Sequence, residues 1–330
     1  HGRGVVLANT VIDATGNAVI PACAGVPCQE IGAEHISVQG AGLPTFAPGA
    51  GYLNGDWTFN DDDDVLDMWR MFVVAKHKNM KDKPRFKDAF DLGQLINTRA
   101  RRRIIGDVVI TPMDIINKRT FPDVITIAKS NFDNHGFSTH TIFMVTPPHG
   151  KGLVGNIPYR ALMPAGYDGI LVTGLGISAH GDAMPVLRMQ PDVQNHGYAA
   201  GYAAALAAKV GTTVRKIDVR ELQKHLVEKE IIPSEMLTAE DSYPISDDAM
   251  KEAVSQFGTD YLGISKVLTD PARALPLLQA AWRESADEKA KLRYAHVLGM
   301  LGDGTGASTM ISALKNAEWD KGWNFRGMGQ

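Results

Sequence analysis

Long apolar runs are absent from this sequence. No stretch reaches the roughly 18 residues that a membrane-spanning helix requires, so no membrane span is expected. A strong excess of one charge is absent as well, because 34 Lys and Arg residues stand against 37 Asp and Glu residues, and the formal net charge is -3. The basic cluster at Arg99 and Arg101–Arg103 is too short to change that balance. Nucleic-acid-binding domains are usually strongly basic, so no nucleic-acid partner is predicted.

Cysteine is scarce, with 2 residues in the whole chain, Cys23 and Cys28. A structural zinc site usually takes four ligands, and there is no second cysteine pair to complete one, so no metal site is predicted. Two small, half-buried thiols are the favoured interpretation of the pair. A local disulfide in an oxidising compartment is the alternative.

An initiating methionine and a signal peptide are also missing from the start of the sequence. It opens on His1-Gly2-Arg3-Gly4, directly before a strand pattern. We expect residues to be missing upstream, and any targeting signal with them. The C-terminus is expected to be incomplete too, because it follows one clear helical repeat. The compartment therefore stays open.

The length of 330 residues predicts two domains, and the hydrophobic content of 44% is ordinary for a globular protein. We place a mixed helix and strand domain at residues 1–230 and a helical region at 231–330. In the second region, residues 286–301 have an amphipathic helical pattern, and residues 307–314 begin another helix after a Leu-Gly-Asp turn. A helix, a turn and a helix in this order are typical of HEAT-like repeats.

Apolar periodicity predicts further elements in the first domain. Strands are expected at 4–12, 104–111 and 168–174, and helices at 18–24, 65–74 and 191–209. Asp61–Asp64 precede the second helix, where acidic side chains favour its N-terminal dipole; a calcium site is the alternative for this tetrad. The run Thr111-Pro112-Met113-Asp114 resembles a helix start with a capping threonine.

Three glycine-rich stretches are candidates for dinucleotide-binding loops, which follow a strand and open a helix. The stretch at 302–306 follows a helix, and the stretch at 150–155 precedes Pro158, which blocks a helix there. Both are interpreted as turns. The stretch at 174–179 follows a strand, but Gly181 and Pro185 soon interrupt any helix, so a diphosphate loop is the less favoured interpretation.

Several further segments carry a resemblance through their order and spacing. They are Val-Ile-Asp-Ala-Thr-Gly at 11–16, Arg-Arg-Arg-Ile-Ile-Gly-Asp at 101–107, Ile-Pro-Tyr-Arg-Ala-Leu at 157–162, Gly-Ile-Leu-Val-Thr-Gly at 169–174, Ile-Ser-Ala-His at 177–180 and Arg-Met-Gln-Pro at 188–191. In this arrangement the first domain resembles a family of FAD-dependent oxidoreductases with a Rossmann-type FAD domain.

The resemblance implies an α/β fold. A partial Rossmann-type FAD domain would contain an inserted substrate part of α+β type, mainly residues 30–165, and an all-α HEAT-like region would follow. The implied cofactor is FAD. Its implied contacts are the turn Ala14, Thr15 and Gly16, the strand end Gly174, and the helix start Arg188, Met189 and Gln190. A helix N-terminus presents unsatisfied N–H groups, which suit the N1/O2 edge of a reduced flavin.

The sequence departs from the family pattern in two respects. The residues at Gly181-Asp182 and Asp192–His196 differ from those common in the family, so the resemblance does not specify the geometry at the flavin edge or the substrate. A strand, Gly-x-Gly-x-x-Gly and a helix should open such a protein and hold the diphosphate, and no stretch near the N-terminus supplies that unit. We therefore expect this chain alone to hold FAD weakly.

The catalytic candidates are His180, His135 and Tyr159, with His140 as a further histidine. Histidine suits proton transfer near neutral pH, and His180 lies closest to the flavin-edge motif, so it is the expected base.

Arg103 and Arg160 are the substrate-binding candidates, because arginine binds carboxylates and stabilises oxyanions. The alternative for Arg101–Arg103 is a structural role, pairing with Asp107 and Asp114.

The predicted function is hydride transfer between FAD and a small organic substrate, which could be a sugar, a hydroxy acid or another alcohol. The alternative is a non-catalytic scaffold that keeps the flavoprotein fold. Its helical repeats would bind protein partners, for which concave repeat surfaces are suited.

Overall fold

A computed structural model of the chain describes residues 4–32, 38–39, 56–57, 61, 63–80, 97–98, 101–132, 138–146 and 152–318. These residues form four small sheets. The strands are β1 (Val11–Asp13), β2 (Cys28–Glu30), β3 (Val38–Gln39), β4 (Asp56–Trp57), β5 (Asn97–Thr98), β6 (Arg102–Ile104), β7 (Val124–Ser130), β8 (Leu153–Pro158) and β9 (Ile170–Val172).

The strand pairing joins segments that are far apart in the sequence. β1 and β9 run parallel, with Ile12 opposite Leu171, whereas β2 with β6 and β7 with β8 are antiparallel. The third small sheet has the order β4-β3-β5. Mixed helix and sheet structure is thus confirmed, and the described residues are compatible with the expected α/β class.

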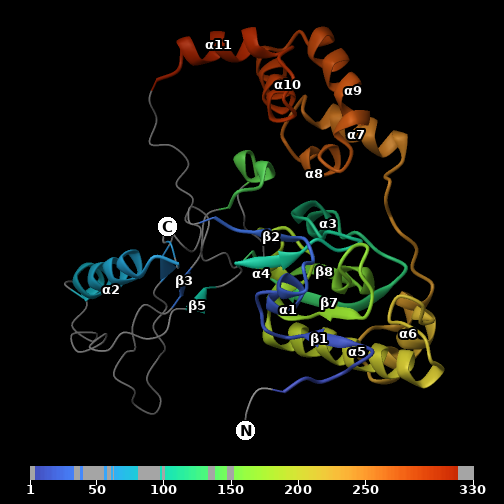
Figure 1. Ribbon diagram of the computed structural model, residues 1–330. Helices are drawn as coiled ribbons and strands as arrows, with labels where there is room; N and C mark the ends of the chain where they lie inside the picture. The colour runs from blue at the N-terminus through green and yellow to red at the C-terminus, as the bar shows by residue number, and fades with distance from the viewer. Residues whose placement is uncertain are drawn as a thin grey trace.

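The helices of the first domain surround these sheets (Figure 1). They are α1 (Val19–Cys23), α2 (Val65–Met80), α3 (Pro112–Ile116), α4 (Met184–Leu187), α5 (Gln190–Val210) and α6 (Val219–Glu228), with 3₁₀ helices η2 (Thr141–Met144), η3 (Tyr159–Leu162) and η4 (Gly174–Gly176). The predicted helix starts at 65 and 111 are confirmed. Thr111 Oγ1 accepts a hydrogen bond from Asp114 N–H, and Asp114 accepts one from Thr111 N–H, which is a capping box.

Two predicted strands were wrong in extent. Of residues 4–12, only Val11 and Ile12 belong to β1, and Val5 and Leu7 are 88% and 94% exposed. Apolar, β-branched composition cannot fix a strand where no partner strand pairs with it. The strand expected at 104–111 shares only Ile104 with the observed strand β6, which ends at that residue. Beyond it, the backbone at Gly106 passes very close to Ser178, because a Cβ on Gly106 would lie 2.7 Å from Ser178 Cβ.

Helix α5 is long because its ends and its buried face suit a helix. Pro191 stands in its first turn, and Gly211 ends it in the left-handed region at φ +68°. The buried alanines Ala199, Ala200 and Ala203 let it pack closely on β7. The close approach of α5 to the sheet therefore rests on these buried alanines.

Gly201 lies inside α5, is exposed, and has no atom within 4 Å of the position that a Cβ would take. We predict that Gly201→Ala raises the free energy of unfolding by about 0.5–1 kcal/mol, because alanine loses less backbone entropy in a helix than glycine does. Urea denaturation measures the change. A destabilised variant would show that a ligand or a neighbouring segment needs the glycine.

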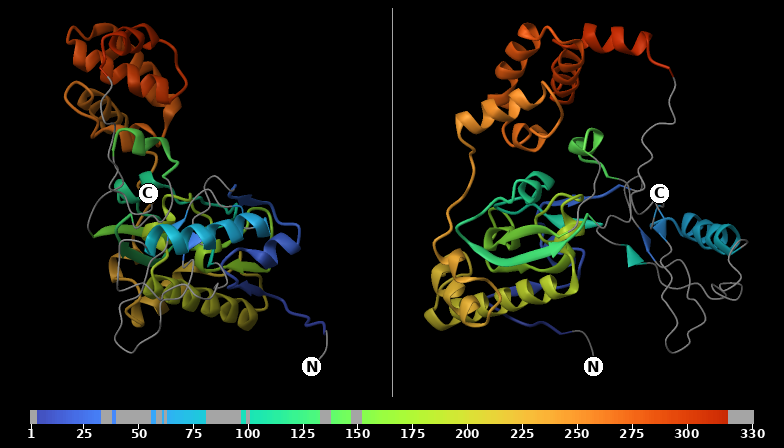
Figure 2. Two further views of the ribbon diagram at one scale, coloured as in Figure 1. Left: turned by 90° about the vertical axis from the view of Figure 1, so that its left-hand side faces the viewer. Right: turned by 180° about the vertical axis from the view of Figure 1, so that it is seen from behind.

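The described residues of the C-terminal region contain helices and no strand. η5 (Ser234–Leu237) packs against α6. The later helices form a separate layer (Figure 2); they are α7 (Asp247–Gln256), α8 (Ile264–Val267), α9 (Pro271–Glu284), α10 (Glu288–Met300) and α11 (Ala307–Lys315). α10 packs against α9 on one side and α11 on the other. The two helices predicted at 286–301 and 307–314 are confirmed, and their assignment to HEAT-like repeats remains a prediction.

Polar contacts join this layer to the first domain where α8 meets α3 (Figure 1). Asn117 Nδ2 donates to Ser265 O at 3.0 Å and to Tyr243 Oη at 2.8 Å. Ser265 Oγ donates back to Asn117 Oδ1 at 2.7 Å. One hydrophobic core also extends from Ile110 to Leu298 across both regions. None of the described helices is long and apolar enough to cross a membrane.

Candidate functional site

The parallel pair β1–β9 places two predicted cofactor-binding turns side by side. Thr173, directly after β9, donates from its backbone N–H and from Oγ1 to the Asp13 carbonyl at 2.8 Å and 3.1 Å. Because parallel strands carry their carboxyl ends at one edge, Ala14–Gly16 and Gly174 leave the sheet together. The structure thus brings together two sequence-predicted turns that are far apart in the chain.

The first turn is held by the buried carboxylate of Asp13, which is 1% exposed. Its two oxygens accept hydrogen bonds from Thr15 N–H at 2.7 Å and Ile20 N–H at 3.1 Å. Thr15 Oγ1 accepts a further bond from Val19 N–H at 3.1 Å. The turn is therefore rigidly tied to the start of α1.

The second turn contacts the first through Gly176. A Cβ there would lie 2.9 Å from Val172 Cγ1 and 3.1 Å from Ala18 N, so only glycine fits this approach. Gly16 and Gly174 have positive φ angles of +83° and +72°, and a Cβ on either would meet nothing within 4 Å. Both turns therefore have open space in front of them.

The N-terminus of α5 lies at the same end of the β1–β9 pair as α1, and α5 contacts η4 (Figure 1). Arg188 ends α4, Met189 is the N-cap of α5, and Gln190 is its first residue and is exposed. The N-cap makes no side-chain hydrogen bond. The predicted helix start is thus confirmed in position, and its N–H dipoles are available to an anionic group.

A second constellation contains Arg103, His140, His180 and a residue that the sequence did not single out, Asp182. Asp182 Oδ2 accepts hydrogen bonds from Thr139 N–H at 2.7 Å and His140 N–H at 2.6 Å. The rings of His140 and His180 meet edge to face, with centroids 5.0 Å apart. Asp182 therefore holds two segments about 40 residues apart in one cluster.

The tautomers of both rings follow from their hydrogen bonds. His180 Nδ1 accepts from Asp182 N–H at 3.1 Å, and His140 Nδ1 accepts from Ile142 N–H at 3.2 Å. In each neutral ring the proton is consequently on Nε2. The expected role of His180 as a base is not supported by this geometry, because a proton taken at Nδ1 would break the Asp182 hydrogen bond. His180 is arranged as an Nε2–H donor.

Burial sets the charge state of this cluster. Desolvation, together with the positive charge of Arg103, lowers the pKa of His180 to about 4. Desolvation, followed by the charge of His180, lowers the pKa of His140. Desolvation raises the pKa of Asp182, and hydrogen bonds from His140 and Thr139 oppose that rise. Both imidazoles are therefore neutral near pH 7.

The other site candidates lie elsewhere. Tyr159 is 1% exposed and its hydroxyl donates to the Val214 carbonyl at 2.9 Å; burial raises its pKa. The Arg160 guanidinium pairs in a bidentate manner with Asp123 at 2.9–3.0 Å. The described contacts thus do not bring either residue into the histidine cluster. His135 lies outside the described residues.

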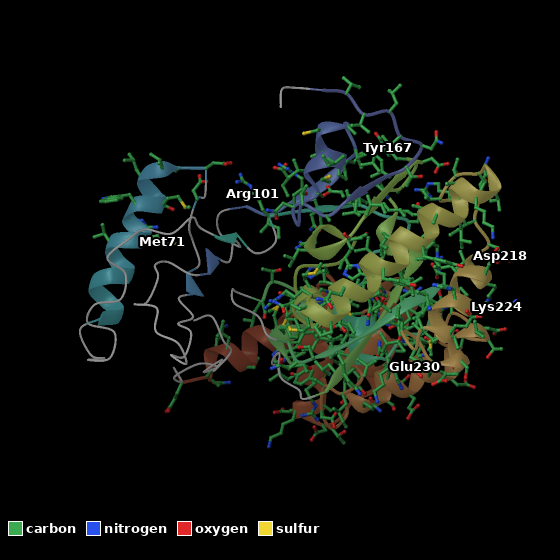
Figure 3. All side chains as sticks on the ribbon, turned by 90° about the horizontal axis from the view of Figure 1, so that it is seen from below. Met71, Arg101, Tyr167, Asp218, Lys224 and Glu230 are labelled. Atoms are coloured by element: carbon green, nitrogen blue, oxygen red, sulfur yellow. The ribbon has the colours of Figure 1, made fainter. Side chains whose placement is uncertain are left out.

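The predicted pairing of Arg101–Arg103 with Asp107 and Asp114 was wrong. Arg101 pairs with Asp63 and Arg102 with Glu30, while Asp107 pairs with Arg215 and Asp114 with Arg119. Nearness in the sequence is a poor guide here, because a strand sends neighbouring side chains to opposite faces. Figure 3 shows Arg101 at the edge of the main body that faces α2.

A family model described as FAD dependent oxidoreductase matches residues 81–226 of the chain. Comparisons with curated proteins and with solved structures give no match. The matched range contains Arg103, His180 and the start of α5, while the Ala14–Gly16 turn precedes it. The match supports the FAD-dependent oxidoreductase family for this chain, and with it flavin-dependent redox activity on a small molecule.

Proposed function

We propose that this chain supplies one wall of the FAD site and the reaction site of an oxidoreductase that transfers hydride between flavin and a small organic substrate. The observation that carries the proposal is the pair of glycine turns at the carboxyl ends of β1 and β9. It stands beside the matched family range. Ligands of open α/β sheets bind at such strand ends.

The residues at this edge fit a flavin nucleotide. The open space in front of Gly16 and Gly174 allows the backbone to approach a ligand closely. Gln190, exposed at the start of α5, offers its backbone N–H to an edge that gains negative charge. When bound, FAD would supply the chemistry of accepting or donating a hydride. Ala14–Gly16, Gly174 and Arg188–Gln190 are the proposed cofactor contacts.

The chain's own part in the reaction is to bind the substrate and control charge on its oxygen. His180 is neutral, and its Nε2–H can donate a hydrogen bond to a carbonyl or alkoxide oxygen at the reacting carbon. Such a donor stabilises the negative charge on the substrate oxygen while hydride moves. The proton of that oxygen is exchanged with solvent, to which the His180 side chain is 29% exposed. Asp182 is a positioning residue, because it holds the His180 and His140 segments together.

The second candidate function is a scaffold that binds a protein through the helical region. It is favoured by an open hollow of about 430 Å³ between α10 and α11, lined by Lys291, Leu292, Thr309 and Ala313 among others. Ile311 and Leu314, both on α11, are 54% and 76% exposed, so this helix leaves apolar surface uncovered. A protein that binds no flavin at its natural length would favour this role.

The flavin proposal is tested by a matched pair of glycine variants in the natural full-length protein. Gly174 and Gly152 both have positive φ, at +72° and +67°, and both have open space around a Cβ. Alanine at either position costs about 1–2 kcal/mol through the left-handed backbone. We predict that Gly174→Ala weakens FAD binding, measured by quenching of flavin fluorescence, while Gly152→Ala does not. Equal FAD affinity in both variants would contradict the assignment of the turn.

A further inference from the structure

The guanidinium of Arg103 is buried without a partner. The residue is 2% exposed, and its Nε and Nη1 atoms make no hydrogen bond. Desolvation lowers its pKa to about 10, so it keeps its charge near pH 7. An isolated buried cation is costly, and native proteins pair such groups or bind an ion to them. An anion is therefore expected at this position.

Asp182 is the acidic residue that acts on Arg103, and it does not form an ion pair with the guanidinium. Asp182 acts on Arg103 only at longer range, and the carboxylate oxygen Oδ2 is already engaged by two backbone N–H groups. Among the described residues, Arg103 forms no ion pair. The backbone at Gly181 lies directly against it, because a Cβ on that glycine would be 3.4 Å from Nη2.

The surroundings of the guanidinium add neutral donors and an opening to solvent. His140 and His180 each carry a proton on Nε2, as their Nδ1 contacts require. The His180 side chain is 29% exposed, and Thr139 is exposed. A ligand can thus reach the imidazoles from solvent while the guanidinium lies deeper. All three side chains can donate hydrogen bonds to an anion.

We propose that Arg103, with the Nε2–H group of His140, binds a small organic carboxylate, so that the substrate of the proposed reaction is an organic acid and the Nε2–H of His180 stays available to the oxygen at its reacting carbon. The carboxylate suits a planar guanidinium, which recognises it with two parallel hydrogen bonds. A phosphate dianion is disfavoured relative to a carboxylate, because Asp182 acts electrostatically on this site and repels two negative charges more strongly than one. That this organic acid is the substrate of a redox reaction rests on the proposed function. The binding of a carboxylate does not, since it does not require flavin.

The test titrates the whole chain, without FAD, with glycolate and acetate as carboxylate probes and inorganic phosphate as the contrast. The readouts are the melting temperature and the ring resonances of His140 and His180. Both carboxylates are expected to raise the melting temperature and to shift these resonances, and phosphate is expected to do neither. Phosphate binding as tight as that of glycolate would overturn the carboxylate assignment.

Variants locate the site. Arg103→Met removes the buried charge, should not lower stability in the absence of an anion, and should weaken glycolate binding by about tenfold to a hundredfold. Gly181→Ala places a methyl group against the guanidinium and should weaken binding without disturbing the fold. The matched control is Arg102→Met on the same strand, because Arg102 already pairs with Glu30 at 2.8 Å.

The outcomes separate this inference from the proposed function. No glycolate binding by the wild-type chain, or equal binding by the Arg103→Met variant, would overturn the inference. If the natural full-length protein nevertheless holds FAD, the proposed function would stand. Carboxylate binding that depends on Arg103 in a protein that never holds FAD would support the site and contradict the flavin function.

Discussion

Replacing Arg119 by alanine is expected to lower the free energy of unfolding by about 3–5 kcal/mol, the cost of removing one partner from a largely buried ion pair. The Arg119 guanidinium contacts Asp114 at 3.2 Å and Asp241 at 2.9 Å. It also lies 4.4 Å from the ring centroids of both Phe121 and Tyr243. Alanine would leave the Asp114 carboxylate, whose side chain is 5% exposed, without its cation.

Urea denaturation of wild type and variant measures this effect, and Lys251→Ala is the control. Lys251 pairs with Asp248 at 3.7 Å on the exposed face of α7, with side chains 64% and 96% exposed. Exposed helix pairs contribute about 0.3–0.5 kcal/mol. A loss of less than about 1 kcal/mol for Arg119→Ala would show that this junction of the two regions is solvated in solution.

Acidification is expected to destabilise the protein through His196, which is fully buried on α5 with both ring nitrogens unpartnered. Desolvation lowers its pKa from 6.5 to about 4. Above pH 6.5 the ring is neutral in both states and adds no pH dependence. Between pH 6.5 and 4 the unfolded chain takes up the proton first, so stability falls by about 3 kcal/mol.

The variant His196→Leu has no titrating group at this position and should lose about 3 kcal/mol less between the same pH values. His180 contributes a fall of the same sign, so the variant keeps part of the dependence. Leu206→Ala, on the same helix, is the control. It should cost about 2–5 kcal/mol at every pH and leave the slope unchanged. An equal slope in His196→Leu and wild type would show that His196 titrates normally in the folded protein.

The sequence predicted the long elements well, because their signals are local. α5 carries Pro191 at its start and Gly211 at its end, and alanines line its buried face. Strand extents were predicted poorly, since pairing partners set them. β1 is limited to the residues that face β9, and the apolar residues before it remain exposed despite their strand-like composition.

Of the candidate site, the sequence indicated the residues that stand in local motifs and missed a residue whose role depends on contacts between distant segments. His180 and Arg103 were identified by motif, and the structure places both in one cluster. Asp182 was passed over because its role is visible only when the loop at Thr139 and His140 folds onto it. No local pattern encodes that closure. The tautomer of His180, and with it the change from base to donor, also depends on this long-range arrangement.

The buried pair on α5 shows a further signal that periodicity could have supplied. Asp192 and His196 stand four residues apart, on one helix face, and both are buried. This stretch departs from the family pattern in sequence, and its burial follows from the spacing of four residues, which puts both polar side chains on the face that the buried alanines of α5 share.

The visible absorbance spectrum of the protein purified at its natural full length decides between the flavin function and the scaffold function. We expect the absorbance band of an oxidised flavin, which should disappear on reduction, and we expect denaturation to release FAD. A colourless protein that gains no flavin band after incubation with FAD would rule out the flavin function and favour the scaffold.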